Sequence, residues 1–125
     1  MKKQKKAPLY QSFGWAAEGI FSCIRTERNI KIHLCAMLLV IIAGVLLKIS
    51  ITEWCICLVL CALVISLELV NTAVEAVVDL VTQEKHPLAK KAKDTAAGAV
   101  LAAAVFAAVC GILIFLPKLC NLLFV

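Results

Sequence analysis

Residues 95–116 read TAAGAVLAAAVFAAVCGILIFL, and these 22 positions contain no charged side chain. An α-helix rises about 1.5 Å per residue, so about 20 residues cross a hydrocarbon core of about 30 Å. This stretch is therefore long enough to span a membrane unaided. The whole chain has the same character, because 63% of its 125 residues are hydrophobic and its mean hydropathy is +1.00. We predict an all-α membrane protein.

Two further apolar runs, residues 34–47 and 54–67, need their flanks to reach membrane length. The first extends to about 31–50, where Lys31 and Lys48 can place their ammonium groups at the two interfaces. The second continues past Glu68 as a helix over about 52–81, so its last three turns are expected to emerge on the cytoplasmic side. With a third span over about 94–116, we expect one integral-membrane domain covering 1–125.

An amphipathic helix is predicted ahead of the first span, over about 8–28. Apolar residues recur there at helical spacing, and they are Leu9, Phe13, Ala16, Ala17, Ile20, Phe21 and Ile24. This pattern is typical of a helix that lies on a membrane surface. Pro8 suits its beginning, and residues 26–29 are expected to hold the turn into the first span.

The basic residues predict the orientation. They gather before the first span and between the second and third, at Lys2, Lys3, Lys5, Lys6, Arg25, Arg28, Lys85, Lys90, Lys91 and Lys93. We therefore expect a multi-pass protein of the plasma membrane, with a cytoplasmic N-terminus and an external C-terminus. The net charge of +5 then reflects topology and attraction to lipid headgroups, and no nucleic-acid partner is expected.

Seven cysteines do not predict a metal site or a disulfide framework. Most of them fall inside the apolar runs, where a thiol behaves as a small apolar group. Cys55 and Cys57 are two positions apart on a helix and so do not face each other, and the chain has no paired CxxC motif.

Polar side chains share one face of the second predicted span, where residues 68–79 read ELVNTAVEAVVD. At about 100° per residue, Glu68, Asn71, Thr72, Glu75 and Asp79 form one polar stripe opposite an apolar face. A carboxylate at membrane depth costs about 2.5 to 3.5 kcal/mol, and clustered carboxylates need a cation or a shared proton. This favours a function for Glu68 and Glu75. Asp79, nearest the following loop, is explained equally well as a solvated helix end.

A magnesium ion would neutralise such a stripe, because Mg²⁺ prefers one or two carboxylates together with water and substrate phosphates. Glu27, just before the first span, is a further candidate ligand, although pairing with Arg25 or Arg28 explains it equally well. The sequence contains no Walker A loop, and it contains no GxGxxG motif after a strand. The fingerprints of soluble nucleotide-binding folds are therefore absent from it.

A loop is expected over residues 82–94, which read TQEKHPLAKKAKD. Lys93 is suited to bridging phosphate oxygens, and Asp94 to orienting Lys93 or a metal-bound water. Lys90 and Lys91 are interpreted as ordinary flanking charges, and a lone loop histidine such as His86 is more often solvated.

The small residues that follow, among them Gly98 and Ala102, allow close helix contact in lipid. We therefore expect a homo-oligomer with its sites between protomers.

The stripe pattern ExxNxAxEAxxD, followed by Ala92-Lys93-Asp94 and an alanine-rich helix, resembles the prokaryotic diacylglycerol kinase family over about residues 13–115. Glu27 also falls where this family has a glutamate before the first span. The resemblance implies a homotrimer of three-helix protomers, each with an N-terminal surface helix. It also implies transfer of the ATP γ-phosphate to a lipid hydroxyl with Mg²⁺.

The resemblance assigns roles to individual residues. Glu68 resembles the general base, and Asn71 the residue that positions the reacting groups. Glu75 and Glu27 resemble the metal ligands. The residues that resemble nucleotide contacts are Glu84, Lys85, His86, Lys93 and Asp94.

Two features are similar to the undecaprenol kinase branch of single-membrane bacteria. They are the short N-terminus and the loop HPLAKKAKD. The surface helix, with Trp15, Glu18 and no basic residue between Lys6 and Arg25, differs from the diacylglycerol kinases of bacteria with two membranes. The expected reaction is therefore phosphorylation of undecaprenol, with diacylglycerol as the alternative lipid. A transporter or proton-relay oligomer is a different alternative. It predicts a polar line across the whole membrane, whereas residues 54–67 offer only Ser66 and cysteines.

Overall fold

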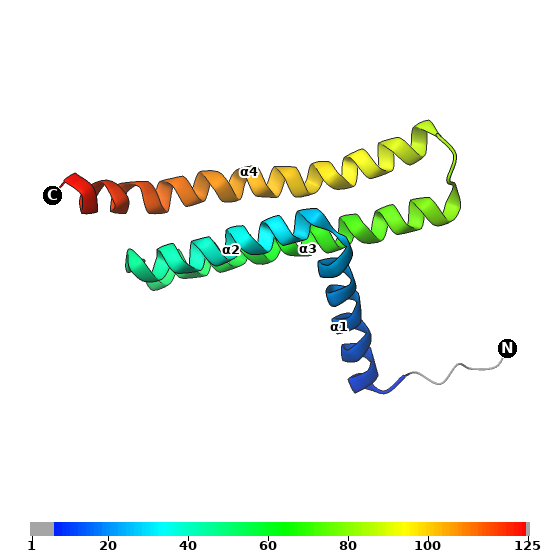
Figure 1. Cartoon of the computed structure of the whole chain (residues 1–125), viewed down its shortest axis with the longest axis horizontal. Helices are drawn as coiled ribbons and strands as arrows, with labels where there is room; N and C mark the ends of the chain where they lie inside the picture. The colour runs from blue at the N-terminus through cyan, green and yellow to red at the C-terminus, as the bar shows by residue number, and fades with distance from the viewer. Residues whose placement is uncertain (1–6, 125) are drawn as a thin grey trace.

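The computed structural model describes residues 7–124, which form four helices: α1 (Leu9–Thr26), α2 (Arg28–Leu46), α3 (Ile51–Val81) and α4 (Pro87–Phe124). Helices α2, α3 and α4 run alongside one another, while α1 projects away from them (Figure 1). Each of these three is long and apolar enough to cross a membrane. The predicted all-α class with three candidate spans is confirmed. The basic residues Lys2, Lys3, Lys5 and Lys6, used to predict the orientation, lie outside the described residues.

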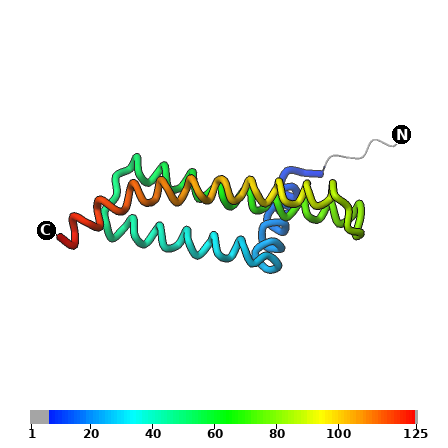
Figure 2. The backbone as a smooth tube through the Cα atoms, turned by 90° about the horizontal axis from the view of Figure 1, so that it is seen from above, coloured from blue at the N-terminus to red at the C-terminus, as the bar shows by residue number. Residues whose placement is uncertain are grey.

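Helix α3 is the centre of the bundle. It packs most extensively on α4 and less on α2, whereas α2 and α4 barely touch. Viewed from above, α4 runs over α3 with α2 to one side (Figure 2). The shared core is thin, and its buried side chains include Cys57, Val64, Val100 and Ala103.

Helix α4 is longer than the predicted span at both ends, so the expectation of a loop over 82–94 was wrong. Only residues 82–86 connect α3 to α4, and the helix begins at Pro87. Proline suits a first helical turn, where its missing N–H has no partner to lose, and the alanines and lysines after it are good helix formers. Helix α4 then continues through Pro117 to Phe124. Lys93 and Asp94 consequently lie on a helix.

A single residue, Glu27, separates α1 from α2. Its backbone is extended, with φ −93° and ψ 126°, and its N–H donates to the Cys23 carbonyl at 2.8 Å. The Lys31 ammonium donates to the Arg25 carbonyl at 2.9 Å across the same corner. Ile30, in the first turn of α2, is fully buried. The turn falls within the predicted range of 26–29 and sends α1 out at a steep angle (Figure 1).

The turn between α2 and α3 is a Schellman motif with lysine at the left-handed position. Lys48 has φ 50°, its N–H donates to the Val45 carbonyl at 3.3 Å, and the Ile49 N–H donates to the Gly44 carbonyl at 3.1 Å. A Cβ added to Gly44 would lie 2.7 Å from the Trp54 ring, which is closer than real contacts allow. Glycine at position 44 therefore lets α3 pack against the end of α2.

A capping box opens α3. The Ser50 hydroxyl accepts from the Glu53 N–H at 3.2 Å, and the Glu53 carboxylate accepts from the Ser50 N–H at 2.6 Å. The same carboxylate lies 3.2 Å from the ammonium of Lys118 near the end of α4. The bundle is thus held at the end opposite the α3–α4 loop.

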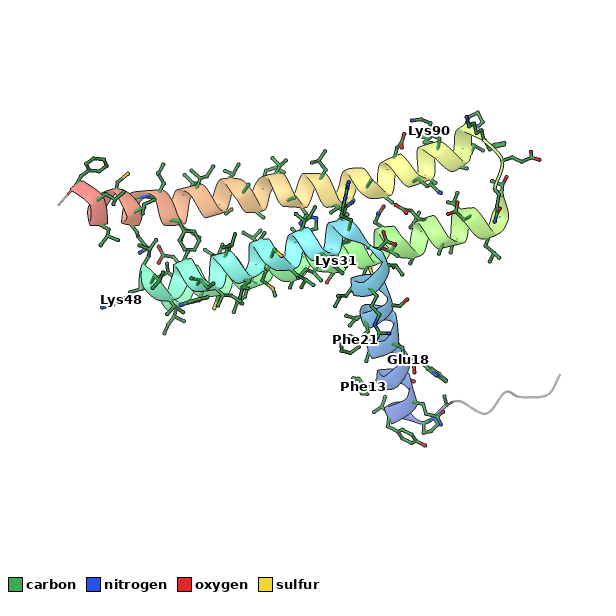
Figure 3. The ribbon with its side chains drawn as sticks, viewed as in Figure 1. Phe13, Glu18, Phe21, Lys31, Lys48 and Lys90 are labelled. Atoms are coloured by element: carbon green, nitrogen blue, oxygen red, sulfur yellow. The ribbon has the colours of Figure 1, made fainter. Side chains whose placement is uncertain are left out.

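Large apolar side chains remain exposed along all three long helices; Leu39 on α2, Val59 on α3 and Leu113 on α4, for example, are 66–70% exposed. On α1, every residue from 9 to 22 is exposed. Phe13 and Phe21 lie on the side of α1 towards the Lys48 end of the bundle, and Glu18 lies on the other side (Figure 3). A single protomer leaves these apolar surfaces without partners, as expected for surfaces that meet lipid or another chain.

Candidate active site

The polar stripe of α3 runs from a buried end to an exposed end. Glu68 is 2% exposed and Asn71 6%, Thr72 and Glu75 are partly buried, and Asp79 is exposed. The buried end packs in the bundle near the α1–α2 corner, whereas the last turns of α3 and the first turns of α4 extend past that corner (Figure 1). The polar stripe therefore has a buried end at Glu68 and a solvent-exposed end at Asp79.

Among the described residues, one fully buried acceptor in this stripe lacks a partner. The Asn71 amide donates through Nδ2 to Glu75 Oε1 at 3.0 Å, but its Oδ1 accepts no hydrogen bond within residues 7–124. Within the same residues, no hydrogen bond or ion pair reaches the Glu68 carboxylate. Buried polar groups are normally paired, and an unpaired one costs about 1–3 kcal/mol. A ligand that donates a hydrogen bond, such as an alcohol, suits either group.

Helix α1 reaches the stripe through a side-chain hydrogen bond. The Cys23 thiol lies 3.3 Å from the Thr72 hydroxyl, and Thr72 in turn donates to the Glu68 carbonyl at 3.0 Å. Glu27 follows Cys23 by one helical turn, and Glu75 follows Thr72 by one turn. The two predicted metal ligands therefore both lie about one turn from the same contact.

A pocket of about 670 Å³ lies between the end of α3 and the start of α4. This volume is within the usual range for small-molecule sites, about 300 to 1,000 Å³. Its lining includes all five residues predicted to contact nucleotide, which are Glu84, Lys85, His86, Lys93 and Asp94. His86 Nδ1 also accepts from the Leu88 N–H at 3.1 Å and so caps the first turn of α4.

Two ion pairs order the charges around this pocket. The Lys93 ammonium lies 2.6 Å from Asp79, whereas Asp94 pairs with Lys90 one turn before it. The expectation that Asp94 orients Lys93 was wrong as far as direct contact is concerned, because consecutive residues on a helix point in different directions. Lys90, interpreted as a flanking charge, also lines the pocket. The i,i+4 spacing of Lys90 and Asp94 was the sequence signal that could have predicted their ion pair.

The oxygen ligands suit a magnesium ion shared with substrate. Within residues 7–124, no group of three or more His, Cys, Asp or Glu side chains is close enough to hold a metal alone. Magnesium, however, commonly takes one or two carboxylates and completes its shell with water and substrate phosphates. The Glu75 carboxylate, about one helical turn before the first pocket residue, fits that kind of open site, whereas Glu27 lies at the corner between α1 and α2 and does not line the pocket.

The sequence profile of the prokaryotic diacylglycerol kinase family matches residues 14–115. The chain belongs to this family. The match includes α2, α3, most of α1 and α4, and every candidate site residue. The pocket and the polar stripe therefore lie within the part of the chain that defines a prokaryotic diacylglycerol kinase.

Named relatives within the prokaryotic diacylglycerol kinase family include enzymes for two lipids. The chain is similar to undecaprenol kinase of Bacillus subtilis, with 52% identity over 111 residues, covering 89% of this chain and 90% of that protein. It is 44% identical to a diacylglycerol kinase of Synechocystis over 92% of this chain and 66% of that protein. It is 35% identical to a diacylglycerol kinase of Helicobacter pylori over 84% and 78%.

Proposed function

We propose that this protein is a lipid kinase that transfers the γ-phosphate of ATP to undecaprenol and forms undecaprenyl phosphate. The observation that carries this proposal is the buried pair Glu68 and Asn71, with Asn71 Oδ1 unpaired within residues 7–124, on a helix whose exposed end lines a pocket that contains lysines. The choice of undecaprenol is supported by the 52% identity to an undecaprenol kinase. Diacylglycerol, giving phosphatidic acid, is the second candidate, supported by the relatives named diacylglycerol kinase.

Phosphoryl transfer requires alignment of the reacting oxygens and stabilisation of charge. Glu68 accepts the proton of the lipid hydroxyl, and its burial excludes competing water. Asn71 positions the reacting groups, because its Nδ2 donates to Glu75 at 3.0 Å. Glu75 and Glu27 would hold Mg²⁺, which when bound draws charge from the phosphate oxygens.

The nucleotide is proposed to occupy the pocket between α3 and α4. Lys93 binds phosphate oxygens as a point charge, and the segment Glu84, Lys85 and His86 together with Asp94 surrounds the rest of the molecule. The pocket begins at Val78, about one turn beyond Glu75 on α3, so phosphates extending towards the stripe meet the carboxylates. The lipid then enters from the membrane side and the nucleotide from water.

The proposed membrane placement has α1 lying on the cytoplasmic surface of the plasma membrane. Its apolar side, marked by Phe13 and Phe21, is turned towards the Lys48 end of the bundle, and Glu18 is turned away (Figure 3). With the Lys48 end outside, the apolar side of α1 meets lipid and Glu18 meets cytoplasmic water. Lys31 and Lys90 then lie on the cytoplasmic side, in agreement with the distribution of basic residues.

A homotrimer is proposed as the active form. Three helices bury few side chains, and the exposed apolar residues of α3 and α4 offer surfaces to further copies. Small residues along α4, including Gly98, leave space for close approach, because an added Cβ there meets nothing within 4 Å.

One experiment tests the activity and the substrate together. Purified protein in detergent is given labelled ATP and magnesium, with undecaprenol and diacylglycerol offered side by side. We expect labelled undecaprenyl phosphate at a rate well above that of phosphatidic acid. Labelling of neither lipid contradicts the kinase proposal, and faster labelling of diacylglycerol contradicts the substrate choice.

A further inference from the structure

Cys23 makes a contact that joins segments far apart in the chain. Its thiol is 3.3 Å from the hydroxyl of Thr72, 49 positions away, and the cysteine is only 4% exposed. From residue 9 to residue 22 every side chain of α1 is exposed, so Cys23 is where this helix first becomes buried. The last turn of α1 is also held by the Lys31 ammonium, which donates to the Arg25 carbonyl at 2.9 Å.

The direction of the hydrogen bond follows from a proton count. A threonine hydroxyl carries one hydrogen, and Thr72 donates it to the Glu68 carbonyl at 3.0 Å. The Thr72 oxygen is then available only as an acceptor, so the Cys23 thiol is the donor. A continuous path results, from thiol to hydroxyl to the backbone of the proposed general base.

The backbone of Cys23 also makes a hydrogen bond to the turn between α1 and α2. Its carbonyl accepts the Glu27 N–H at 2.8 Å, at the point where the backbone becomes extended and the chain turns into α2. The Glu27 backbone is therefore hydrogen-bonded to Cys23, which forms one side of the Cys23–Thr72 contact. On the other side, Thr72 lies three residues before Glu75, on the same face of α3.

We propose that Cys23 is a positioning residue, whose thiol donates to Thr72 and so holds Glu27 beside the polar stripe of α3. This inference rests on the proposed function, since it gives Glu27 a metal-binding role. The thiol needs only to donate a hydrogen bond to Thr72. We therefore expect serine at position 23 to preserve this positioning role and alanine to abolish it.

The first test compares variants in their response to magnesium. A thiol is a weak donor, so Cys23→Ala is expected to raise the half-maximal magnesium concentration about two- to fivefold, with little change in the KM for lipid. Cys23→Ser and the control Cys35→Ala, at an exposed cysteine of α2, are expected to stay close to the parent. Equal responses of Cys23→Ala and Cys35→Ala would overturn the inference.

The second test uses no catalysis. Amide hydrogen exchange of the metal-free protein is followed over residues 24–30 by mass spectrometry. Exchange is expected to be faster in Cys23→Ala and Thr72→Val than in the parent, Cys23→Ser and Thr72→Ser. The double variant Cys23→Ala, Thr72→Val should exchange no faster than either single variant, because both remove the same bond. Additive acceleration, or none, contradicts the inference.

A third variant separates the inference from the proposed function. If Glu27→Gln leaves the magnesium response unchanged, the metal role of Glu27 is wrong, and a change in exchange would still establish the contact itself. If Glu27→Gln shifts the response and Cys23→Ala changes neither magnesium response nor exchange, the proposed function stands and the positioning role fails. Should Cys23→Ala fail to fold, Thr72→Val is compared with Thr72→Ser on both measurements.

Discussion

The ammonium of Lys93 on α4 lies 2.6 Å from the carboxylate of Asp79 on α3. The two side chains are 36% and 56% exposed, so the pair contributes at most about 1 kcal/mol to stability. Its consequence is positional, because it joins the two helices that form the pocket and keeps the Lys93 ammonium at the pocket wall. Asp79, ambiguous in sequence, is thereby given a specific partner.

Replacing Lys93 should weaken nucleotide binding. A hydrogen bond to a charged group is worth about 1.5–3 kcal/mol, so Lys93→Gln is expected to raise the KM for ATP at least tenfold. The matched control is Lys91→Gln, which removes an exposed lysine two positions away that does not line this pocket. Steady-state kinetics with varied ATP measure the difference, and equal KM values for the two variants would exclude Lys93 as a phosphate contact.

Removal of the proposed base should separate activity from stability. Glu68→Gln keeps the shape of the side chain, and in the described residues it breaks no hydrogen bond to the carboxylate. We expect kcat to fall about 10²- to 10⁴-fold while the Tm in detergent stays the same or rises, because an amide is easier to bury than a charged carboxylate. A strongly lowered Tm would instead indicate a structural role for Glu68.

Replacing Glu75 should give a different kinetic pattern. Glu75→Gln can still accept the 3.0 Å hydrogen bond from Asn71, so the fold is expected to be preserved. Loss of one metal ligand should raise the half-maximal magnesium concentration about tenfold, with part of kcat recovered at saturating magnesium. A magnesium titration measures this. An unaltered titration curve would remove Glu75 from the metal site.

A charge at position 71 should be poorly tolerated. Asn71→Asp removes the amide donor and places a second carboxylate against Glu75 at a site that is 6% exposed. A loss of stability of about 1–3 kcal/mol and of most activity is expected. The control is Asn29→Asp, where the side chain is exposed in the first turn of α2 and an acidic residue is favourable. Thermal unfolding of both variants decides whether the effect belongs to the buried site.

The turn between α2 and α3 should depend on glycine at position 44. Gly44→Ala brings a methyl group to 2.7 Å from the Trp54 ring, so we expect a loss of about 1–3 kcal/mol and a lower Tm. Gly14→Ala is the control, since an added Cβ there meets nothing within 4 Å. If Trp54 moves aside without cost, the two variants will unfold at similar temperatures.

The spans and the polar stripe were predictable because both depend on local properties. Helices satisfy backbone hydrogen bonds within themselves, so an apolar run such as residues 95–116 has one stable form in lipid. Helical periodicity then puts Glu68, Asn71 and Glu75 on one face whatever surrounds them. The start of α4 was missed although Pro87 is a local signal, because the lysines after it were interpreted as a charged loop.

The contacts between segments could not be predicted in the same way. Sequence spacing does not specify which side chain of α1 meets α3, nor that Lys93 pairs with Asp79 while Asp94 pairs with Lys90. Those pairings depend on the five-residue connection 82–86 and on the corner at Glu27, which set where each helix lies against its neighbours.

By itself, the sequence determined the three long apolar helices of the described residues and the face of α3 that carries the carboxylates. Lipid leaves the chain few alternatives, so composition and period suffice for these features. Only the tertiary structure decided that Glu68 is buried beside an unpaired Asn71 oxygen, and that the pocket forms between α3 and α4. Burial and pocket shape arise from helices packed at particular angles, which no single segment encodes.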